Sequence, residues 1–344
     1  MRDNNILAVD LAKNCFQLCK LSSQGKVIYN RELSRQKLKE CLAKEKTALV
    51  TMEACGGAHY WARLAVSLGH QVKVINARVV KGFQTKQKTD KNDALAIGIA
   101  AMQAHIHSVK VLTLDEQSLQ AQSRSRELAL SQQIAQSNHI RGLLNEFGIV
   151  MPQGCAALKQ HIPLILEDAE NGLSEMFRAH LQRLWLALVA QYEYVKTLTD
   201  ALEQHVKADG VCQKLMKLEG VGPQGALGLA LRLGRGEHFA SGRDASACIG
   251  LTPKQHSSGG KERIGHISKR SADKRLRSLL FQGALAVISH VVKRVAKTNK
   301  ELWLQALVAR RGTKIAAIAL ANKTVRTAYA LLKSDSTYEA KLVA

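Results

Sequence analysis

The sequence predicts an α/β domain at its N-terminus, followed by long helices and a helical C-terminal region. Three observations lead to this prediction. Short apolar runs alternate with helix-type segments over the first 110 residues, which is typical of an α/β layer domain. A long polar segment with leucines at steps of three and four follows, and it indicates extended amphipathic helices. The last third contains further amphipathic segments separated by turns rich in Gly and Ser.

The length of the chain predicts more than one domain, and its charge predicts a polyanionic partner. The chain has 344 residues, which is too long for one ordinary core, so two or three domains are expected. Its formal net charge is +22, from 50 Lys and Arg against 28 Asp and Glu. Such an excess favours a polyanionic partner, with nucleic acid as the first candidate and an anionic membrane surface as the rival.

Targeting and redox signals place the expected protein in the cytoplasm. No apolar run reaches the roughly 18 residues of a membrane-spanning helix, and the first residues lack the apolar core of a signal peptide. The seven cysteines are scattered without a CxxC pair, which gives no support to a zinc ribbon and fits a reducing compartment.

The N-terminal region divides into strands and helices of ordinary length. Two apolar segments around a Ser-Gln-Gly turn predict a β-hairpin, and later strands alternate with helices, so a mixed sheet is expected. The expected strands are residues 6–9, 15–21, 27–33, 48–52 and 72–75, and the expected helices are residues 36–44, 58–68 and 94–102.

Acidic residues follow two of these strands. Asp10 and Glu53 come directly after buried-type strands, at the edge of an open α/β sheet where ligands bind. Asp90 and Asp93 are three residues apart at the start of a helix capped by Thr89 or Asp90, so they share one face. Taken singly, each acid is better explained as an ordinary strand-end or helix-start charge. Four converging carboxylates repel one another, however, and hard divalent cations that serve phosphoryl transfer relieve that repulsion.

The middle of the chain predicts two long helices, residues 114–147 and 174–206. The second carries an apolar seam of the coiled-coil type, with Gln191 at one seam position. Its apolar residues are Leu181, Leu184, Leu188, Val195, Leu198 and Leu202. The seam serves equally well for packing within one subunit or for pairing between subunits.

A glycine turn suggests contact with a nucleic-acid backbone. Residues 215–233 predict two helices joined by Gly220-Val221-Gly222, which is a helix-hairpin-helix pattern. The amides of such a turn and the next helix N-terminus can bind a phosphate without reading sequence. A plain turn between helices would have the same sequence. Further helices are expected at residues 239–249, 276–292 and 314–333, followed by a loose tail.

The stretch Gly250–Arg277 joins a small-residue turn to many cations. The turn is Ser257-Ser258-Gly259-Gly260, where glycine lets the backbone approach a phosphate and serine offers a hydroxyl. The cations, which would neutralise charge developing on that phosphate, are Lys254, Lys261, Arg263, Lys269, Arg270, Lys274, Arg275 and Arg277. Taken alone, the same stretch is better explained as a basic surface loop with flexible serines.

These motifs together resemble the DEDD-type insertion-sequence transposases, a family that includes the Piv site-specific DNA invertase. AVDLAKN, TMEACG and TDKNDA, which hold Asp10, Glu53, Asp90 and Asp93, resemble the DEDD signature of a RuvC-like (RNase H-like) domain. LEGVGPQGALGLALRLG and the later FASGRDASACIGLTPKQHSSGGKERIGHISKRSADKRLRSLL resemble the second conserved domain. The resemblance covers nearly the whole chain in the same order.

The resemblance implies a domain plan and a site. The plan is a RuvC-like domain (1–110), a helical coiled-coil segment (111–207), an all-α serine and helix-hairpin-helix domain (208–334) and a tail (335–344). The four acids would hold Mg²⁺. The family's serine nucleophile aligns with Ser258, with Ser257 as a one-residue ambiguity. Lysines, arginines and glycines would contact nucleic acid, namely Lys254, Lys261, Arg263, Lys269, Arg270, Gly220 and Gly222, and His256 would assist the charge.

The resemblance also implies partners. Members recombine donor and target DNA under the direction of a structured bridge RNA, and they assemble as dimers that pair into tetramers. Their active site is composite, with acids and serine from different subunits, and the work takes place in the bacterial cytoplasm at the nucleoid. Two rival hypotheses stay open: a hydrolytic structure-selective nuclease in which Ser258 only positions phosphate, and a non-catalytic RNA- or DNA-binding protein.

Overall fold

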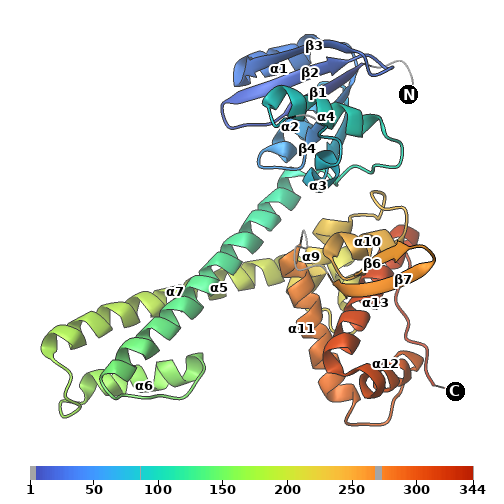
Figure 1. The fold of residues 1–344 in the computed structure, drawn as a ribbon. Helices are drawn as coiled ribbons and strands as arrows, with labels where there is room; N and C mark the ends of the chain where they lie inside the picture. The colour runs from blue at the N-terminus through green and yellow to red at the C-terminus, as the bar shows by residue number, and fades with distance from the viewer. Residues whose placement is uncertain (1–4, 86, 268–272, 344) are drawn as a thin grey trace. The chain divides into compact units, whose positions relative to one another are not determined.

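The computed structural model describes residues 5–85, 87–267 and 273–343 (Figure 1). The chain divides into two compact units, one formed by residues 116–213 and the other by residues 1–115 and 214–344. The domain boundaries expected at residues 110 and 207 stay predictions. Across the described ranges, no helix is both long enough and apolar enough to cross a membrane.

A five-stranded mixed sheet organises the N-terminal part, in the order β3-β2-β1-β4-β5. Central β1 pairs antiparallel with β2 and parallel with β4, and all five expected strands are present. The strands are β1 (Ile6–Asp10), β2 (Cys15–Leu21), β3 (Val27–Ser34), β4 (Leu49–Glu53) and β5 (Gln71–Ile75). The mixed sheet predicted from the sequence is therefore confirmed.

Both faces of this sheet are covered, which explains the unbroken apolar run of its central strand β1. Leu7 and Val9 of β1 lie in a core shared with α1 and α2, while Ile6 and Ala8 lie in a second core shared with α4. A Cβ at Gly98 of α4 would lie 2.4 Å from the Leu21 side chain, so α4 packs close to the sheet. The helices are α1 (Arg35–Lys44), α2 (Ala58–Ser67), α3 (Ala77–Lys81), which the sequence did not predict, and α4 (Asp90–Met102).

The unit of residues 116–213 is helical, and α5 (Leu114–Glu146) and α7 (Glu175–Ala208) contact each other in it. Gln191, at the polar position of the predicted seam, donates from Nε2 to the Ala129 carbonyl of α5 at 3.0 Å. The seam residues Leu181, Leu188, Val195 and Leu202 are buried within the single chain. This burial supports the intrasubunit use of the seam, and a coiled coil between subunits stays a prediction.

A helix in this unit runs through a proline. The connection between the two long helices contains α6 (Cys155–Glu167), with Pro163 inside it. Leu158 and Ile162 of α6 are fully buried against the long helices. The helix continues through Pro163 because burial of its apolar face outweighs the one backbone hydrogen bond that proline removes.

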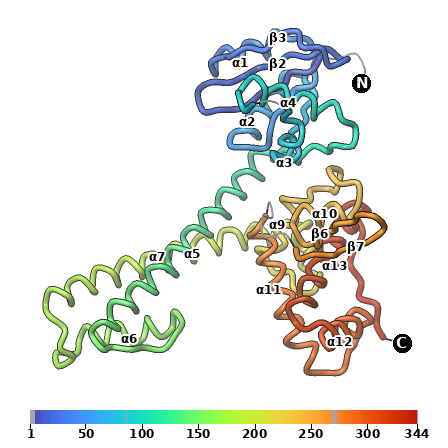
Figure 2. The backbone as a smooth tube through the Cα atoms, in the orientation of Figure 1, coloured from blue at the N-terminus to red at the C-terminus, as the bar shows by residue number. Residues whose placement is uncertain are grey.

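The residues described in the C-terminal part form helices and one β-hairpin (Figures 1 and 2). The expectation of an all-α region misses this hairpin because its strands are exposed and show no apolar alternation. The elements are α8 (Gly210–Met216), α9 (Pro223–Leu233), α10 (Gly242–Ile249), β6 (Pro253–Ser258), β7 (Lys261–Ile267), α11 (Lys274–Val291), α12 (Asn299–Arg311) and α13 (Thr313–Ser334).

The turn between α8 and α9 packs against α11 through two glycines. A Cβ at Gly283 of α11 would lie 1.8 Å from the Gly220 carbonyl oxygen, and a Cβ at Gly220 would lie 2.7 Å from the Gly283 carbonyl oxygen. Gly220 also has φ of +77°, in the left-handed region. Packing therefore explains the glycine at position 220 without a phosphate, and the helix-hairpin-helix function stays a prediction.

Gly283→Ala is expected to destabilise the C-terminal part by about 2–4 kcal/mol, because a backbone oxygen cannot move aside as a side chain can. The sign is opposite to helix propensity, which favours alanine over glycine by about 1 kcal/mol. Gly222→Ala is the control, since Gly222 has φ of −88° and nothing lies within 4 Å of its added Cβ. Urea denaturation followed by circular dichroism measures both, and an unchanged midpoint for Gly283→Ala would contradict the packing argument.

The C-terminal tail is anchored, which differs from the loose tail expected from its sequence. The Tyr338 hydroxyl donates to Glu219 Oε1 at 2.7 Å, and Lys300 Nζ lies 2.7 Å from Glu219 Oε2. The Asn299 amide donates to the Lys341 carbonyl at 3.0 Å. Burial raises the pKa of the Tyr338 hydroxyl, and the Glu219 carboxylate adds to that shift. The tail thus fastens α12 to the turn that precedes α9.

Candidate active site

Two of the four acids lie at one edge of the sheet because of the parallel pairing of β1 and β4. Val9 pairs with Met52, so the next residues, Asp10 and Glu53, end adjacent strands at their carboxyl edge. The other two acids lie in the first turn of α4, where the Thr89 hydroxyl caps the helix by accepting from the Asn92 amide at 3.3 Å.

The four carboxylates interact electrostatically. Partial burial raises the pKa of Asp10 to about 6, with further contributions from Asp93, Asp90 and Glu53. Burial also raises the pKa of Glu53, and the charge of Asp93 adds to that shift. The Lys88 ammonium opposes both shifts. The arrangement therefore concentrates negative charge at the sheet edge and holds it at a cost in free energy.

The serine turn is a tight β-hairpin. Gly259 and Gly260 have φ of +55° and +75°, the left-handed conformations that a two-residue hairpin turn of the primed type requires. The turn fixes the register, in which Ser258 pairs with Lys261 and Ser257 pairs with Glu262. The Ser-Ser-Gly-Gly sequence therefore pairs Ser258 with a basic residue and Ser257 with an acidic residue.

The two faces of this hairpin differ in charge. Side chains alternate along a strand and cross-strand partners share a face, so Ser258 lies with Lys261, His256 and Arg263. Ser257 lies on the other face with Glu262, and its hydroxyl accepts from Gln255 Nε2 at 3.3 Å. Ser258 is therefore the serine that a phosphate would approach among cations.

Comparison with known proteins places the chain in a family. Residues 7–149 match the DEDD transposase domain of IS110 elements, and residues 212–300 match the transposase IS116/IS110/IS902 family. A Coxiella burnetii protein named as the transposase for insertion sequence element IS1111A is 39% identical over 338 residues, covering 98% of this chain and 92% of that protein. The chain belongs to the IS116/IS110/IS902 family of transposases.

Other relatives of this transposase span equally long stretches. A probable family 20 transposase of Pseudomonas aeruginosa is 35% identical and covers 96% of the chain and 98% of that relative. The transposase for insertion sequence element IS1328 of Yersinia enterocolitica is 32% identical, covering 98% and 99%. The mixed sheet agrees with an RNase H-like DEDD transposase domain.

The acids of the transposase fit a divalent cation by their chemistry. Transposase domains of the DEDD type generally use divalent metal ions. The donors here are carboxylate oxygens, which hard cations prefer, and their repulsion is what a cation would relieve. Within the described ranges, no three His, Cys, Asp or Glu side chains are close enough to form a metal site as they stand. The acids would therefore have to turn inward around the ion.

Two residues near the acids were not singled out by sequence reasoning. Gln84 Nε2 donates to Asp93 Oδ1 at 2.8 Å and so holds that carboxylate. Lys88, two residues before Asp90, supplies the cation that opposes the pKa shifts of Asp10 and Glu53. Its position two residues before Asp90 could have indicated a role near the acids. Its effect on Asp10 and Glu53, however, depends on the fold, which brings Lys88 near the ends of β1 and β4.

The remaining predicted nucleic-acid contacts lie in the C-terminal part. Lys254, Lys261 and Arg263 are exposed on the hairpin. Lys269 and Arg270 lie outside the described residues. Gly222 is exposed at the N-terminus of α9, whereas Gly220 packs against α11. The acids and Ser258 thus belong to separate parts of the chain.

Proposed function

We propose that this transposase cuts and rejoins DNA strands through a covalent phosphoserine at Ser258, with Asp10, Glu53, Asp90 and Asp93 as the Mg²⁺-binding acids. The observation that carries the proposal is the hairpin register, because it surrounds Ser258 with Lys261, His256 and Arg263. A second support is the family membership, since the DEDD acids and the serine segment both fall within matched regions.

The chemistry conserves phosphoester bonds. The Ser258 oxygen attacks phosphorus and passes its proton to His256 or to water, while the bond from phosphorus to a sugar oxygen breaks and that oxygen takes a proton from water and leaves as a hydroxyl. Lys261 and Arg263 balance the charge that develops on the phosphate oxygens. Bound Mg²⁺ would supply polarisation of the scissile phosphate. A hydroxyl of another strand then attacks the phosphoserine and restores Ser258, so rejoining needs no ATP.

The proposed assembly uses more than one copy of the chain. Acids of one subunit would meet the serine of another, within dimers that pair into tetramers. A structured bridge RNA would choose donor and target DNA by base pairing, which leaves the protein to hold backbones. The net charge of +22 supports this division of labour, since backbone contacts need cations rather than base-reading side chains. The site of action would be bacterial DNA in the cytoplasm.

Trapping of the covalent intermediate tests the chemistry. The purified transposase is incubated with Mg²⁺ and a DNA carrying the ends of its element, denatured, and digested to peptides. We expect a nucleotide attached to the peptide that contains Ser258, identified by mass spectrometry. Cut DNA ends without any protein attached would contradict the proposal and favour hydrolysis by an activated water.

Sequencing of co-purified RNA tests the guide. We expect one structured RNA, encoded beside the gene, to be enriched over total cellular RNA. An extensive ribonuclease treatment should then abolish strand exchange, and re-addition of that RNA should restore it. Full activity after ribonuclease treatment would contradict RNA guidance while leaving the serine chemistry untouched.

A further inference from the structure

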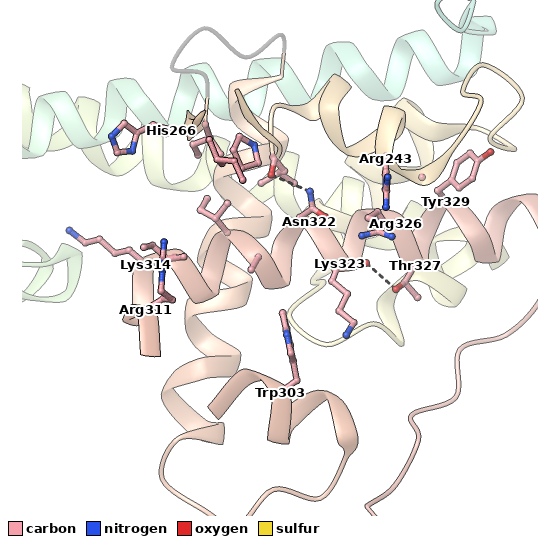
Figure 3. A pocket seen from close by; sticks show the side chains of 18 of the residues that line it. Arg243, His266, Trp303, Arg311, Lys314, Asn322, Lys323, Arg326, Thr327 and Tyr329 are labelled. Carbon is pink, nitrogen blue, oxygen red and sulfur yellow. Dashed lines mark hydrogen bonds between the residues drawn. The ribbon is translucent and has the colours of Figure 1, made fainter. Parts of the chain in front are cut away.

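A large pocket lies in the C-terminal part (Figure 3). Its volume is about 1680 Å³, and its lining comes from α10, β7, α12 and one face of α13. The α13 residues that line it run from Lys314 to Ala330, which corresponds to about 24 Å of helix. In the lining, Ile264 pairs with Gln255 and Ile267 pairs with Pro253, so by strand alternation both lie on the hairpin face opposite Ser258. The pocket is therefore separate from the proposed serine site.

The pocket is lined by basic residues and by no acid. The basic lining residues are Arg243, His266, Arg311, Lys314, Lys323 and Arg326. Over the part of the chain that the structure describes, none of these six forms an ion pair with a carboxylate. Partial burial lowers the pKa of Lys323, the nearby charges of Lys300 and Arg326 add to that shift, and Glu219 outside the lining opposes it. A lining with several cations and no acid attracts an extended anion.

An aromatic ring and apolar surface lie among these cations. The Lys323 ammonium of α13 lies 4.4 Å from the ring centroid of Trp303, which belongs to α12 (Figure 3). Ile315, Ile318 and Leu251 supply apolar lining. A duplex keeps its bases stacked inside and offers only phosphates, whereas an unpaired strand offers phosphates and bare bases together. An indole within a cationic pocket matches the unpaired strand.

We propose that this pocket binds an unpaired segment of DNA, with phosphates held by Arg243, Lys323 and Arg326 and a base stacked on Trp303. The proposal rests on the function proposed above only in taking DNA as the substrate. It requires neither a phosphoserine nor a guide RNA. Strand exchange must create unpaired segments, and a protein that joins strands gains from holding them apart from the reacting bond.

Binding without cleavage tests the cations. Full-length protein in EDTA is titrated into a labelled single-stranded 12-mer DNA, the matching duplex and the matching RNA, with anisotropy as the readout. We expect Arg243→Gln/Arg326→Gln to weaken single-stranded DNA binding at least about tenfold and to reduce the slope of log affinity against log salt by about 1.4. The matched control is Lys293→Gln/Arg310→Gln, which removes the same charge from exposed positions outside the pocket and should change affinity by less than about twofold.

Fluorescence tests the stacking. We expect single-stranded DNA to quench tryptophan emission in the wild type and in Trp61→Phe, and the quenching to disappear in Trp303→Leu, with a loss of affinity of about tenfold. Trp303→Phe, which keeps an aromatic ring, should retain most of the affinity and so separates stacking from a folding defect.

Three results would overturn the proposal. The pocket variant and its matched control could bind single-stranded DNA equally. The pocket variant could lose duplex binding as strongly as single-strand binding, which would mean that no unpaired segment is recognised. The loss could be confined to the RNA 12-mer, which would make RNA the occupant. EDTA prevents metal-dependent cutting, so the test measures binding alone. Its result can therefore be interpreted even if the phosphoserine mechanism is wrong.

Discussion

Ser258→Ala is expected to reduce the covalent protein–DNA adduct by at least about 10³-fold, because no other hydroxyl lies on the cationic face of the hairpin. Ser257→Ala is the matched control. It removes the same atoms one residue away, on the face of Glu262, and should leave adduct formation within about threefold of wild type. The measurement is the fraction of labelled DNA that stays with the protein after denaturation.

DNA binding and thermal unfolding show whether either substitution has a wider effect. Both serines are exposed, so both variants should bind DNA and melt as the wild type does. Loss of the adduct in Ser257→Ala with full activity in Ser258→Ala would show that the other face of the hairpin carries the chemistry. Loss in neither variant would remove serine from the mechanism.

The acidic half of the site could be predicted because buried strands have recognisable apolar sequences. β1 and β4 are covered on both faces, so their sequences are mostly apolar, with the buried Thr51 as the one polar residue before the final acid, and an acid directly after such a run marks the strand end. Parallel pairing then brings the two strand ends together. Lys88 could not be assigned in the same way, because its influence on Asp10 depends on how the chain returns before α4.

The serine half could be found but not resolved by sequence alone. Ser257 and Ser258 are adjacent residues of the same type, so the sequence does not show which of them is the nucleophile. Only the register set by the glycine turn puts them on faces of different charge. The strands themselves were missed because neither face is buried, so no alternation of apolar residues is required. The cationic pocket was missed for a different reason: its basic residues are spread over residues 243–326 and meet only after folding.

Asp10→Asn is expected to abolish strand cutting and, at the same time, to stabilise the metal-free protein. The lost activity follows from removal of a carboxylate that would hold the cation, with a loss of at least about 10²-fold. The gained stability follows from the partial burial that raises the pKa of Asp10 to about 6, with repulsion by Asp93, Asp90 and Glu53 adding to the shift. Because Asp10 is only partly buried, screening by solvent limits this gain to on the order of 1 kcal/mol at pH 8.

The stability difference between the wild type and Asp10→Asn is expected to depend on pH. The folded pKa of Asp10, about 6, lies above its ordinary value of 3.8, so the folded state binds the proton more tightly than the unfolded state does. The wild type therefore loses stability as pH rises from about 4 through 6, and Asp10→Asn does not share this loss. Thermal melts in EDTA should show the two proteins converging near pH 4 and separating at pH 8, with Glu339→Gln, an exposed acid in the tail, as the control. Added Mg²⁺ should then stabilise the wild type and not Asp10→Asn, whereas equal melting of the two proteins at pH 8 in EDTA would show that the folded state does not disfavour the charged form of Asp10.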